Sequence, residues 1–388
     1  MLRRRGFLAF AAAAASRSRI ESVERSVVWD GEKNGFTWFH PRPCRVPDGL
    51  LMAVQDISGS DVFGPVHWSA SADGGHGWSE PVPIPGLERR ELPNGNEEAI
   101  CDTVPQYHPA TESVIFLGWN VYYKDDKLTL PNEQRWPVYV VRRADGSWTQ
   151  RSKLDWDNPT AARIYGSNCS QRLTLPDGDV LIPLTYASYE RTDRVVGTVL
   201  CGFDGERLAV KRTGNYLELG VKRGLLEPSI TSFGDAFHMT IRAEDGRGYV
   251  SSSADGLDWG PIKPWTWDDS EPLEMSTTQQ HWLTRPEALY LVYTRKTREN
   301  AEVMRWRSPL LTARVDPQSM TLIRETEAVL LPLRERDKSD LADAARLGNF
   351  HPVDISPEES LVLVGEARPN QDWRGDTLQA RIRWRAAG

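Results

Sequence analysis

A glutamate and an arginine frame one short hairpin near the middle of the chain. Glu227 opens an apolar run that reaches Ile230, Gly234-Asp235 forms a turn, and Arg242 closes the next apolar run. In an antiparallel hairpin both charges lie at the same end, where a carboxylate and a guanidinium could bind or activate a polar ligand. A lone pair of this kind is usually a weak surface ion pair, so its meaning depends on the rest of the chain.

The same hairpin design recurs six times. Each copy has a polar opening, an alternating strand, a turn rich in Pro, Asp, Gly or Glu, and a second apolar strand. The spacing of about 60 residues is too long for one hairpin and sufficient for a four-stranded sheet. The copies are His40–Gln55, Asp102–Trp119, Asn168–Tyr186, Glu227–Arg242, Thr277–Tyr293 and Asn349–Glu366.

Composition agrees with many short strands, because 30 Gly, 26 Pro and 15 Trp favour tight turns and large rings between sheets. We therefore predict an all-β fold: a six-bladed β-propeller of four-stranded antiparallel blades, formed by residues 20–388 as a single domain. Leu378–Trp384 supplies only a third strand to the last blade, so we expect Val23–Trp29 to close the ring. Ser339–Leu347 is predicted to be helical.

The N-terminus has the form of an export signal. Arg4-Arg5-Gly6-Phe7-Leu8 precedes a short alanine-rich run, as in twin-arginine signals. We predict that residues 1–19 are this signal, and that the mature protein is periplasmic or secreted and free of the membrane. The net charge of −7 argues against a nucleic-acid partner, which would require a basic face.

The four cysteines show no metal-binding spacing. They lie in strand-like segments, without a C-x-x-C or zinc pattern, so we predict buried thiols and neither a metal nor another cofactor. A disulfide between the first two is left open as an alternative. The cysteines are Cys44, Cys101, Cys169 and Cys201.

The hairpin openings predict a polar ring at one end of the propeller channel, because the first strand of every blade lines that channel. Asp102 is expected to be a second carboxylate there, and Gln280 to contact sugar hydroxyls. A crowded channel of mutually bonded groups is the structural alternative. Counting back from the turns selects His40, Arg42, Asp102, Ser170, Glu227, Gln279 or Gln280, and His351.

Two outer turns add a recognisable pattern. Ser71–Trp78 fits S-x-D-x-G-x-x-W, and Ser253–Trp259 is the same turn one residue shorter. Here Asp bonds the turn backbone, Gly supplies positive φ and Trp packs on the sheet. Six blades with such turns resemble the sialidase superfamily, with its aspartate-box (BNR) repeats. The resemblance implies an exo-sialidase-like glycoside hydrolase acting on a carboxylate-bearing sugar at the channel mouth.

The resemblance implies three arginines that hold the substrate carboxylate. Arg42, on the opening strand of the first blade, matches the first of them, while the competing Arg45 lies on the opposite strand face. Arg242 matches the second. The third belongs to the fifth blade, where Arg307 is preferred over Arg305.

The resemblance also implies an acid and an assisted nucleophile. Asp61, with Asp56 as the alternative, would protonate the leaving oxygen, and Glu227 would assist a tyrosine from the sixth blade. No tyrosine follows Tyr293 in this chain, so we predict His351 as a base in its place. This departure leaves two alternatives open: a polysaccharide lyase acting on uronic-acid glycans, and a carbohydrate-binding propeller without turnover.

Overall fold

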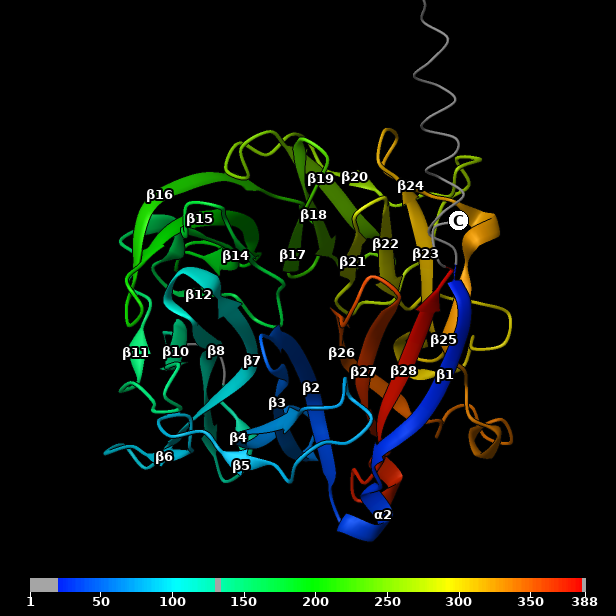
Figure 1. Ribbon diagram of the computed structural model, residues 1–388, viewed down its shortest axis with the longest axis horizontal. Helices are drawn as coiled ribbons and strands as arrows, with labels where there is room; N and C mark the ends of the chain where they lie inside the picture. Colours follow the sequence, from blue (N-terminus) through cyan, green and yellow to red (C-terminus); the bar gives the residue numbers. More distant parts are fainter. Residues whose placement is uncertain (1–19, 130–133, 386–388) are drawn as a thin grey trace, which may run out of the picture.

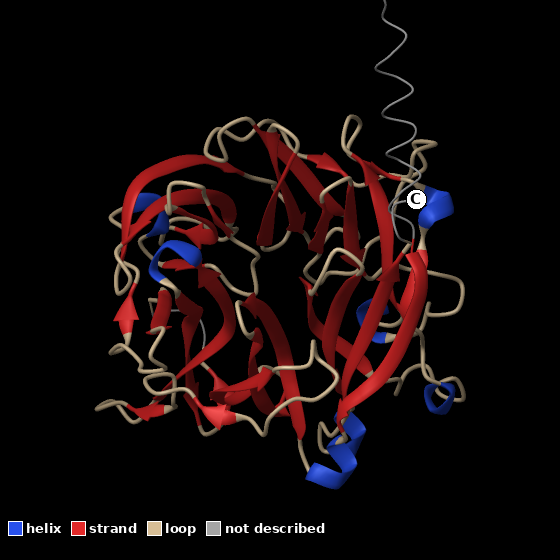
Figure 2. Cartoon of the chain, in the orientation of Figure 1, coloured by secondary structure: helices blue, strands red, loops and turns tan. Residues whose placement is uncertain are grey.

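The computed structural model describes residues 20–129 and 134–385, so the predicted export signal lies outside the described residues. Within these ranges the chain forms six antiparallel sheets around a common axis, with little helix (Figures 1 and 2). The chain is therefore a six-bladed β-propeller, as the sequence repeat predicts. No helix in the described part is long and apolar enough to cross a membrane.

The first three blades follow one another along the chain. Blade one contains β2 (Thr37–Val46), β3 (Gly49–Gly59), β4 (Val62–Ser71) and β5 (Val82–Pro83). Blade two contains β6 (Arg90–Glu91), β7 (Glu97–His108), β8 (Ser113–Lys124), β9 (Lys127–Leu128), β10 (Pro137–Arg142) and β11 (Ser152–Lys153). Blade three contains β12 (Ile164–Gly166), β13 (Leu173–Thr174), β14 (Val180–Ala187), β15 (Val195–Phe203) and β16 (Leu208–Leu217).

The last three blades complete the circle. Blade four contains β17 (Leu226–Phe233), β18 (Ala236–Arg242), β19 (Gly248–Ser253) and β20 (Lys263–Pro264). Blade five contains β21 (His281–Arg285), β22 (Ala288–Tyr293), β23 (Leu310–Asp316), β24 (Thr321–Leu322) and β25 (Ala328–Leu331). Blade six contains β26 (Arg346–Asp354), β27 (Glu359–Ala367), β28 (Thr377–Trp384) and, as its fourth strand, β1 (Ile20–Trp29).

Helical structure is confined to short segments. The helix α2 (Gly31–Asn34) follows β1, and Asp30 caps its N-terminus. The 3₁₀ helices in the described residues are Pro109–Thr111, Pro159–Ala161, Met304–Trp306, Arg324–Thr326, Glu335–Asp337 and Pro369–Gln371. The prediction of a helix over Ser339–Leu347 is wrong: turns fold around the Asp340 carboxylate, which accepts from the backbone of Ala342 and Asp343, and β26 begins at Arg346.

The predicted ring closure is confirmed. β1 pairs antiparallel with β28, with Val23 opposite Ile382, so the two ends of the chain share one sheet (Figure 1). Phe39 of blade one packs closely against blade six at the junction between these two blades. A Cβ on Gly348 would lie 2.0 Å from the Phe39 ring, and one on Gly365 would lie 2.6 Å from it. These two glycines therefore let the blade-one ring pack directly on the backbone of blade six.

The core consists of apolar layers between neighbouring blades. One such layer joins Leu117 of blade two to Ile182 of blade three, and another joins Leu291 of blade five to Val250 of blade four. The four cysteines are buried in the blades as free thiols, so the structure contains no Cys44–Cys101 disulfide. Stability therefore depends on apolar packing between sheets and on the closing strand.

The two outer turns also connect blades. Asp73 accepts hydrogen bonds from the backbone of His76 (3.0 Å) and Gly77 (2.9 Å), as the sequence pattern predicts. Trp259, at the end of the second such turn, donates from its indole Nε1 to Thr198 of blade three at 2.9 Å. The turn of blade four is thus fastened to the preceding blade.

Trp384 provides a test of the closure. Its ring is 3% exposed, packs 5.0 Å from the Tyr290 ring of blade five and donates to Ser360 at 2.8 Å. We expect Trp384→Ala to lower the free energy of unfolding by about 3–5 kcal/mol, as a large core truncation does. The neighbouring Arg383→Ala removes surface ion pairs to Glu24 and Glu359 and should cost less than about 1 kcal/mol. Urea denaturation measures both, and equal effects would contradict the closure argument.

Candidate functional site

The innermost strands of four blades are interrupted at the same place. In β17 the pairing passes from Leu226 opposite Arg242 to Ser229 opposite Thr240, so one extra residue stands in the inner strand. Corresponding shifts interrupt β2, β7 and β26. Each is a β-bulge, a feature that redirects a side chain and often lies beside a functional site.

A left-handed backbone marks each bulge. Blade three has the same feature in the break between β12 and β13. Non-glycine residues adopt this conformation at a cost that their surroundings must offset. All five residues are polar, and the end of the channel that they surround is called the mouth below. They are His40 (φ 53°), Asp102 (φ 56°), Asn168 (φ 47°), Glu227 (φ 47°) and Asn349 (φ 36°).

Glu227 and Arg242 form a buried ion pair at the mouth. Arg242 Nη1 donates to Glu227 Oε1 at 2.6 Å, and Arg242 Nε donates to Thr277 of blade five at 3.1 Å. Burial acts to raise the pKa of Glu227, but the Arg242 charge outweighs it, so the pKa lies below its ordinary value. The other oxygen, Oε2, is buried without a hydrogen-bond partner among the described residues. The carboxylate is thus ionised and keeps one oxygen available.

Asp102 connects three blades. Its Oδ1 accepts from Arg42 of blade one at 2.8 Å and from Asn349 of blade six at 3.2 Å. Its Oδ2 accepts from Trp119 at 3.2 Å, across the strand pair, just as Glu227 accepts from Arg242. Burial raises the pKa of Asp102, Arg42 opposes this, and the nearby negative charge of Glu227 adds to it. Asp102 therefore links blades one, two and six at the mouth.

Arg307 and Asp61 lie within the electrostatic reach of this pair. Burial, with Arg242 and Arg305 adding to it and the charges of Glu227 and Asp61 opposing it, lowers the pKa of Arg307 to about 10. The Arg307 guanidinium has no ion-pair partner in the ranges that the structure describes, and its Nε is buried and unbonded. The Arg307 guanidinium is therefore not paired directly with a carboxylate of the described residues.

Asp61 stands on a fixed turn between β3 and β4. Its backbone is left-handed, with φ 57°, and its side chain is exposed. Tyr123 of blade two donates to the Asp61 carbonyl oxygen at 2.6 Å and accepts from the Phe63 N–H at 3.2 Å. Asp56, the alternative acid, is more enclosed, and burial raises its pKa. Blade two thus sets the position of the Asp61 turn.

Solved structures of known proteins share this architecture. A protein of unknown function from Dyadobacter fermentans matches with a TM-score of 0.58 at 14% identity, over 94% of this chain and 100% of its own. The Trypanosoma rangeli sialidase in complex with sialic acid matches with a TM-score of 0.61 at 13% identity, over 94% and 57%. A Hadza microbial sialidase gives 0.62 at 12% identity, over 92% and 68%.

The chain has a sialidase-like propeller fold. At these identities the likeness concerns the fold, since unrelated activities often share one fold. The chain spans 57% of the length of the Trypanosoma rangeli enzyme. No protein-family model matches the chain, and no curated protein matches it.

The sixth blade of this sialidase-like propeller differs from the sequence-based count. Asn349 occupies the bulge, two residues before His351, and its side chain is bonded to Asp102. Gln279 of blade five supports it: with the amide oriented to satisfy both ends, its oxygen accepts from the Asn349 N–H at 3.2 Å and its nitrogen donates to Asn349 Oδ1 at 2.8 Å. In blade three, likewise, the bulge residue is Asn168 rather than Ser170.

His351 lies deeper in the channel, against His281. Their ring centroids are 4.9 Å apart, and His281 Nδ1 lies 3.0 Å from the Ser229 hydroxyl. Burial, with Arg42 and Arg172 adding to it, lowers the pKa of His351 to about 3. The imidazole is therefore neutral at physiological pH and weakly basic.

Gln280 and Arg305 have different surroundings. Gln280 accepts from Thr240 at 2.9 Å and donates to the Thr278 carbonyl at 3.2 Å, so both ends of its buried amide are occupied. Arg305 has a left-handed backbone, and its carbonyl accepts from the Ser276 hydroxyl. Its guanidinium makes no ion pair within the described ranges and lowers the pKa of Arg307.

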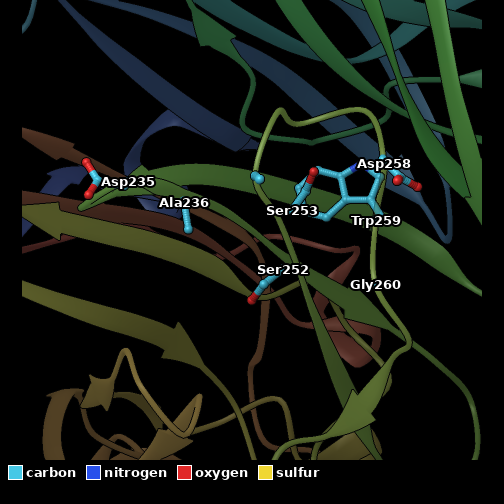
Figure 3. A pocket seen from close by; sticks show the side chains of 8 residues that line it. Asp235, Ala236, Ser252, Ser253, Asp258, Trp259 and Gly260 are labelled. Carbon is cyan, nitrogen blue, oxygen red and sulfur yellow. The ribbon is translucent and has the colours of Figure 1, made fainter.

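Two pockets outside the channel lie away from the mouth. One, of about 430 Å³, is lined by Asp235, Ala236, Ser252 and Trp259 of blade four (Figure 3). Asp235 stands in the β17–β18 turn, the end of the hairpin remote from Glu227. A second pocket, of about 780 Å³, involves the turns of blades two and three on the same remote side. Neither pocket can share a ligand with the mouth.

The ion pair predicts a pH effect on stability. Because the folded-state pKa of Glu227 is depressed, its contribution is complete above the ordinary value of 4.5 and is lost as the pH falls through the lower folded-state value. Glu227→Gln should therefore lower the free energy of unfolding by about 1–3 kcal/mol at pH 7, and the deficit should shrink below pH 4.5. Urea denaturation across pH 3–7 measures this, and a deficit independent of pH would contradict it.

Proposed function

We propose that this protein is an exported glycoside hydrolase that acts on a carboxylate-bearing sugar bound at the mouth. The observation that carries the proposal is the unpaired Arg307 guanidinium near the ionised Glu227–Arg242 pair. A buried positive charge without a partner costs stability unless a ligand supplies the missing anion. A substrate carboxylate would meet Arg307 and Arg242 through charge-assisted hydrogen bonds.

The mouth also contains groups for bond cleavage. In the proposed reaction, Glu227 accepts a proton from a water molecule through its free Oε2. The water oxygen bonds to the anomeric carbon, the glycosidic C–O bond breaks, and Asp61 donates its proton to the departing oxygen. The depressed pKa of Glu227 suits a carboxylate that begins the reaction ionised. Because water attacks the anomeric carbon directly in this scheme, the product has the inverted configuration.

The position of His351 favours hydrolysis over elimination. His351 lies two residues past the bulge that Asn349 occupies, and its ring centroid lies 4.9 Å from that of His281. Glu227, by contrast, stands at a bulge and keeps one oxygen unbonded. A lyase acting through His351 and a propeller that only binds its sugar are therefore the alternatives that the product analysis below decides.

A solved structure that shares this fold supports the proposed substrate class. The Trypanosoma rangeli sialidase, which shares the fold, was solved in complex with sialic acid, an acidic sugar. Export remains a prediction from residues 1–19, consistent with a glycan encountered outside the cytoplasm.

Turnover tests the proposal. The purified protein is incubated with sialosides and uronic-acid oligosaccharides, and a saturated reducing sugar is the expected product. We expect Asp61→Asn to lower kcat by about 10²-fold or more, the usual contribution of a positioned acid. Asp125→Asn is the control, because Asp125 also has a left-handed backbone in an exposed turn. An unsaturated product absorbing in the near ultraviolet would indicate a lyase, and binding without product would indicate a lectin.

Substitution of Arg307 should have opposite effects on ligand affinity and on stability. Arg307→Gln should weaken binding of the acidic sugar about tenfold or more, since it removes a charged contact. It should leave the Tm unchanged or raise it, because the buried, unpaired charge is lost. Calorimetric titration and thermal unfolding measure the two effects. Arg45→Gln, on the exposed face of β2, should change neither, and a variant Arg307→Gln with normal affinity would contradict the assignment.

A further inference from the structure

Two neighbouring blades carry arginines at matching connections. Arg135 stands before β10 of blade two, and its N–H donates to the Arg163 carbonyl of blade three at 3.4 Å. Arg194 stands before β15 of blade three, and its N–H donates to the Arg223 carbonyl at the start of blade four at 2.8 Å. Each connection is a short parallel bridge between blades. The repeat of the fold therefore places basic residues in series beside the inner strands.

Arg194 is anchored next to the segment that delivers Glu227. Its carbonyl accepts from the Leu225 N–H at 3.0 Å, two residues before Glu227. Gly224 lies so close that an added Cβ would be 2.2 Å from the Arg194 carbonyl oxygen. The backbone of Arg194 is thus fixed relative to the left-handed bulge that presents the Glu227 carboxylate.

The charges around Arg194 are of its own sign. Burial, with the guanidiniums of Arg223, Arg135 and Arg163 adding to it and Glu227 opposing it, lowers the pKa of Arg194 to about 10. These like charges make an isolated guanidinium unfavourable unless an anion joins it.

The neighbouring arginines already have partners. Arg223 Nε donates to both oxygens of Glu244 at 3.0 Å. The Arg163 guanidinium donates to the carbonyls of Ser188 at 3.1 Å and Arg191 at 3.0 Å. The Arg194 guanidinium, by contrast, has no hydrogen bond or ion pair within residues 20–129 and 134–385. It is the member of the group that remains available to a ligand.

We propose that Arg194 forms a second anion subsite, which binds a carboxylate on the sugar unit next to the one held at Glu227. This inference rests on the proposed function and narrows the substrate to glycans with acidic groups on adjacent units. The first subsite, with Arg242 and Arg307, holds one carboxylate, and Arg194 holds the next through charge-assisted hydrogen bonds. A glycan with a neutral second unit would leave Arg194 unpaired and bind more weakly.

The test compares matched ligands by calorimetric titration. One pair is the α2,8-linked sialic acid dimer and sialyllactose, and the other is digalacturonate and its derivative with the second carboxylate methyl-esterified. For the pair that binds, the di-acid should bind wild-type protein about tenfold or more tightly than the mono-acid. Arg194→Gln should reduce this ratio to about one and leave mono-acid affinity within about twofold.

Arg212→Gln serves as the matched control. Arg212 lies on β16 of the same blade and its side chain is 64% exposed. Among the described residues its one ion pair is to Asp255 at 3.9 Å, so this variant should keep the wild-type ratio. A ratio near one in the wild type, or a ratio unchanged by Arg194→Gln, would overturn the subsite while leaving the proposed function intact. Absence of binding to all four ligands would contradict both proposals. Thermal unfolding verifies that each variant is folded.

Discussion

The left-handed backbone at one residue on the channel side of five blades determines where the polar groups of this propeller lie. Such a residue costs on the order of 1–3 kcal/mol, so its surroundings must hold it in place. The Asp102 side chain is fixed by hydrogen bonds from Arg42, Trp119 and Asn349, which belong to three different blades. The Glu227 side chain is fixed chiefly by its hydrogen bond from Arg242. The same contacts that fix these bulges therefore arrange the mouth.

Stability and function make opposite demands at this end of the molecule. Arg307 and Arg194 are enclosed among like charges, and burial depresses the pKa of each. The apolar layers between blades and the β1–β28 pairing provide the stability that tolerates them. Local arrangements that reduce stability are expected where a protein binds a ligand. The positive charge is not spread over the whole surface, since the chain is acidic overall.

The sequence was sufficient for the architecture and for part of the mouth. Hairpin periodicity predicts six blades, and the unpaired last strand predicts closure by β1. Antiparallel geometry alone brings Glu227 and Arg242 together. The bulges could not be predicted, because the inner strands are buried on both faces. The change of face that one inserted residue causes therefore leaves no visible break in a hydrophobic alternation. Counting from the turns therefore selects His351 and Ser170, whereas the structure has Asn349 and Asn168 at the bulges.

Arg194 was missed for a related reason. It lies in a connection between strands, with no periodic pattern, and only the bridge to Gly224 brings it near Glu227. The most direct measurement of the whole account is a crystal structure of the protein soaked with an acidic sugar. The account predicts the sugar carboxylate within hydrogen-bonding distance of Arg307 and Arg242, with the anomeric carbon facing Glu227. A sugar bound at the remote pockets, or a mouth without a sugar at saturating concentration, would contradict it.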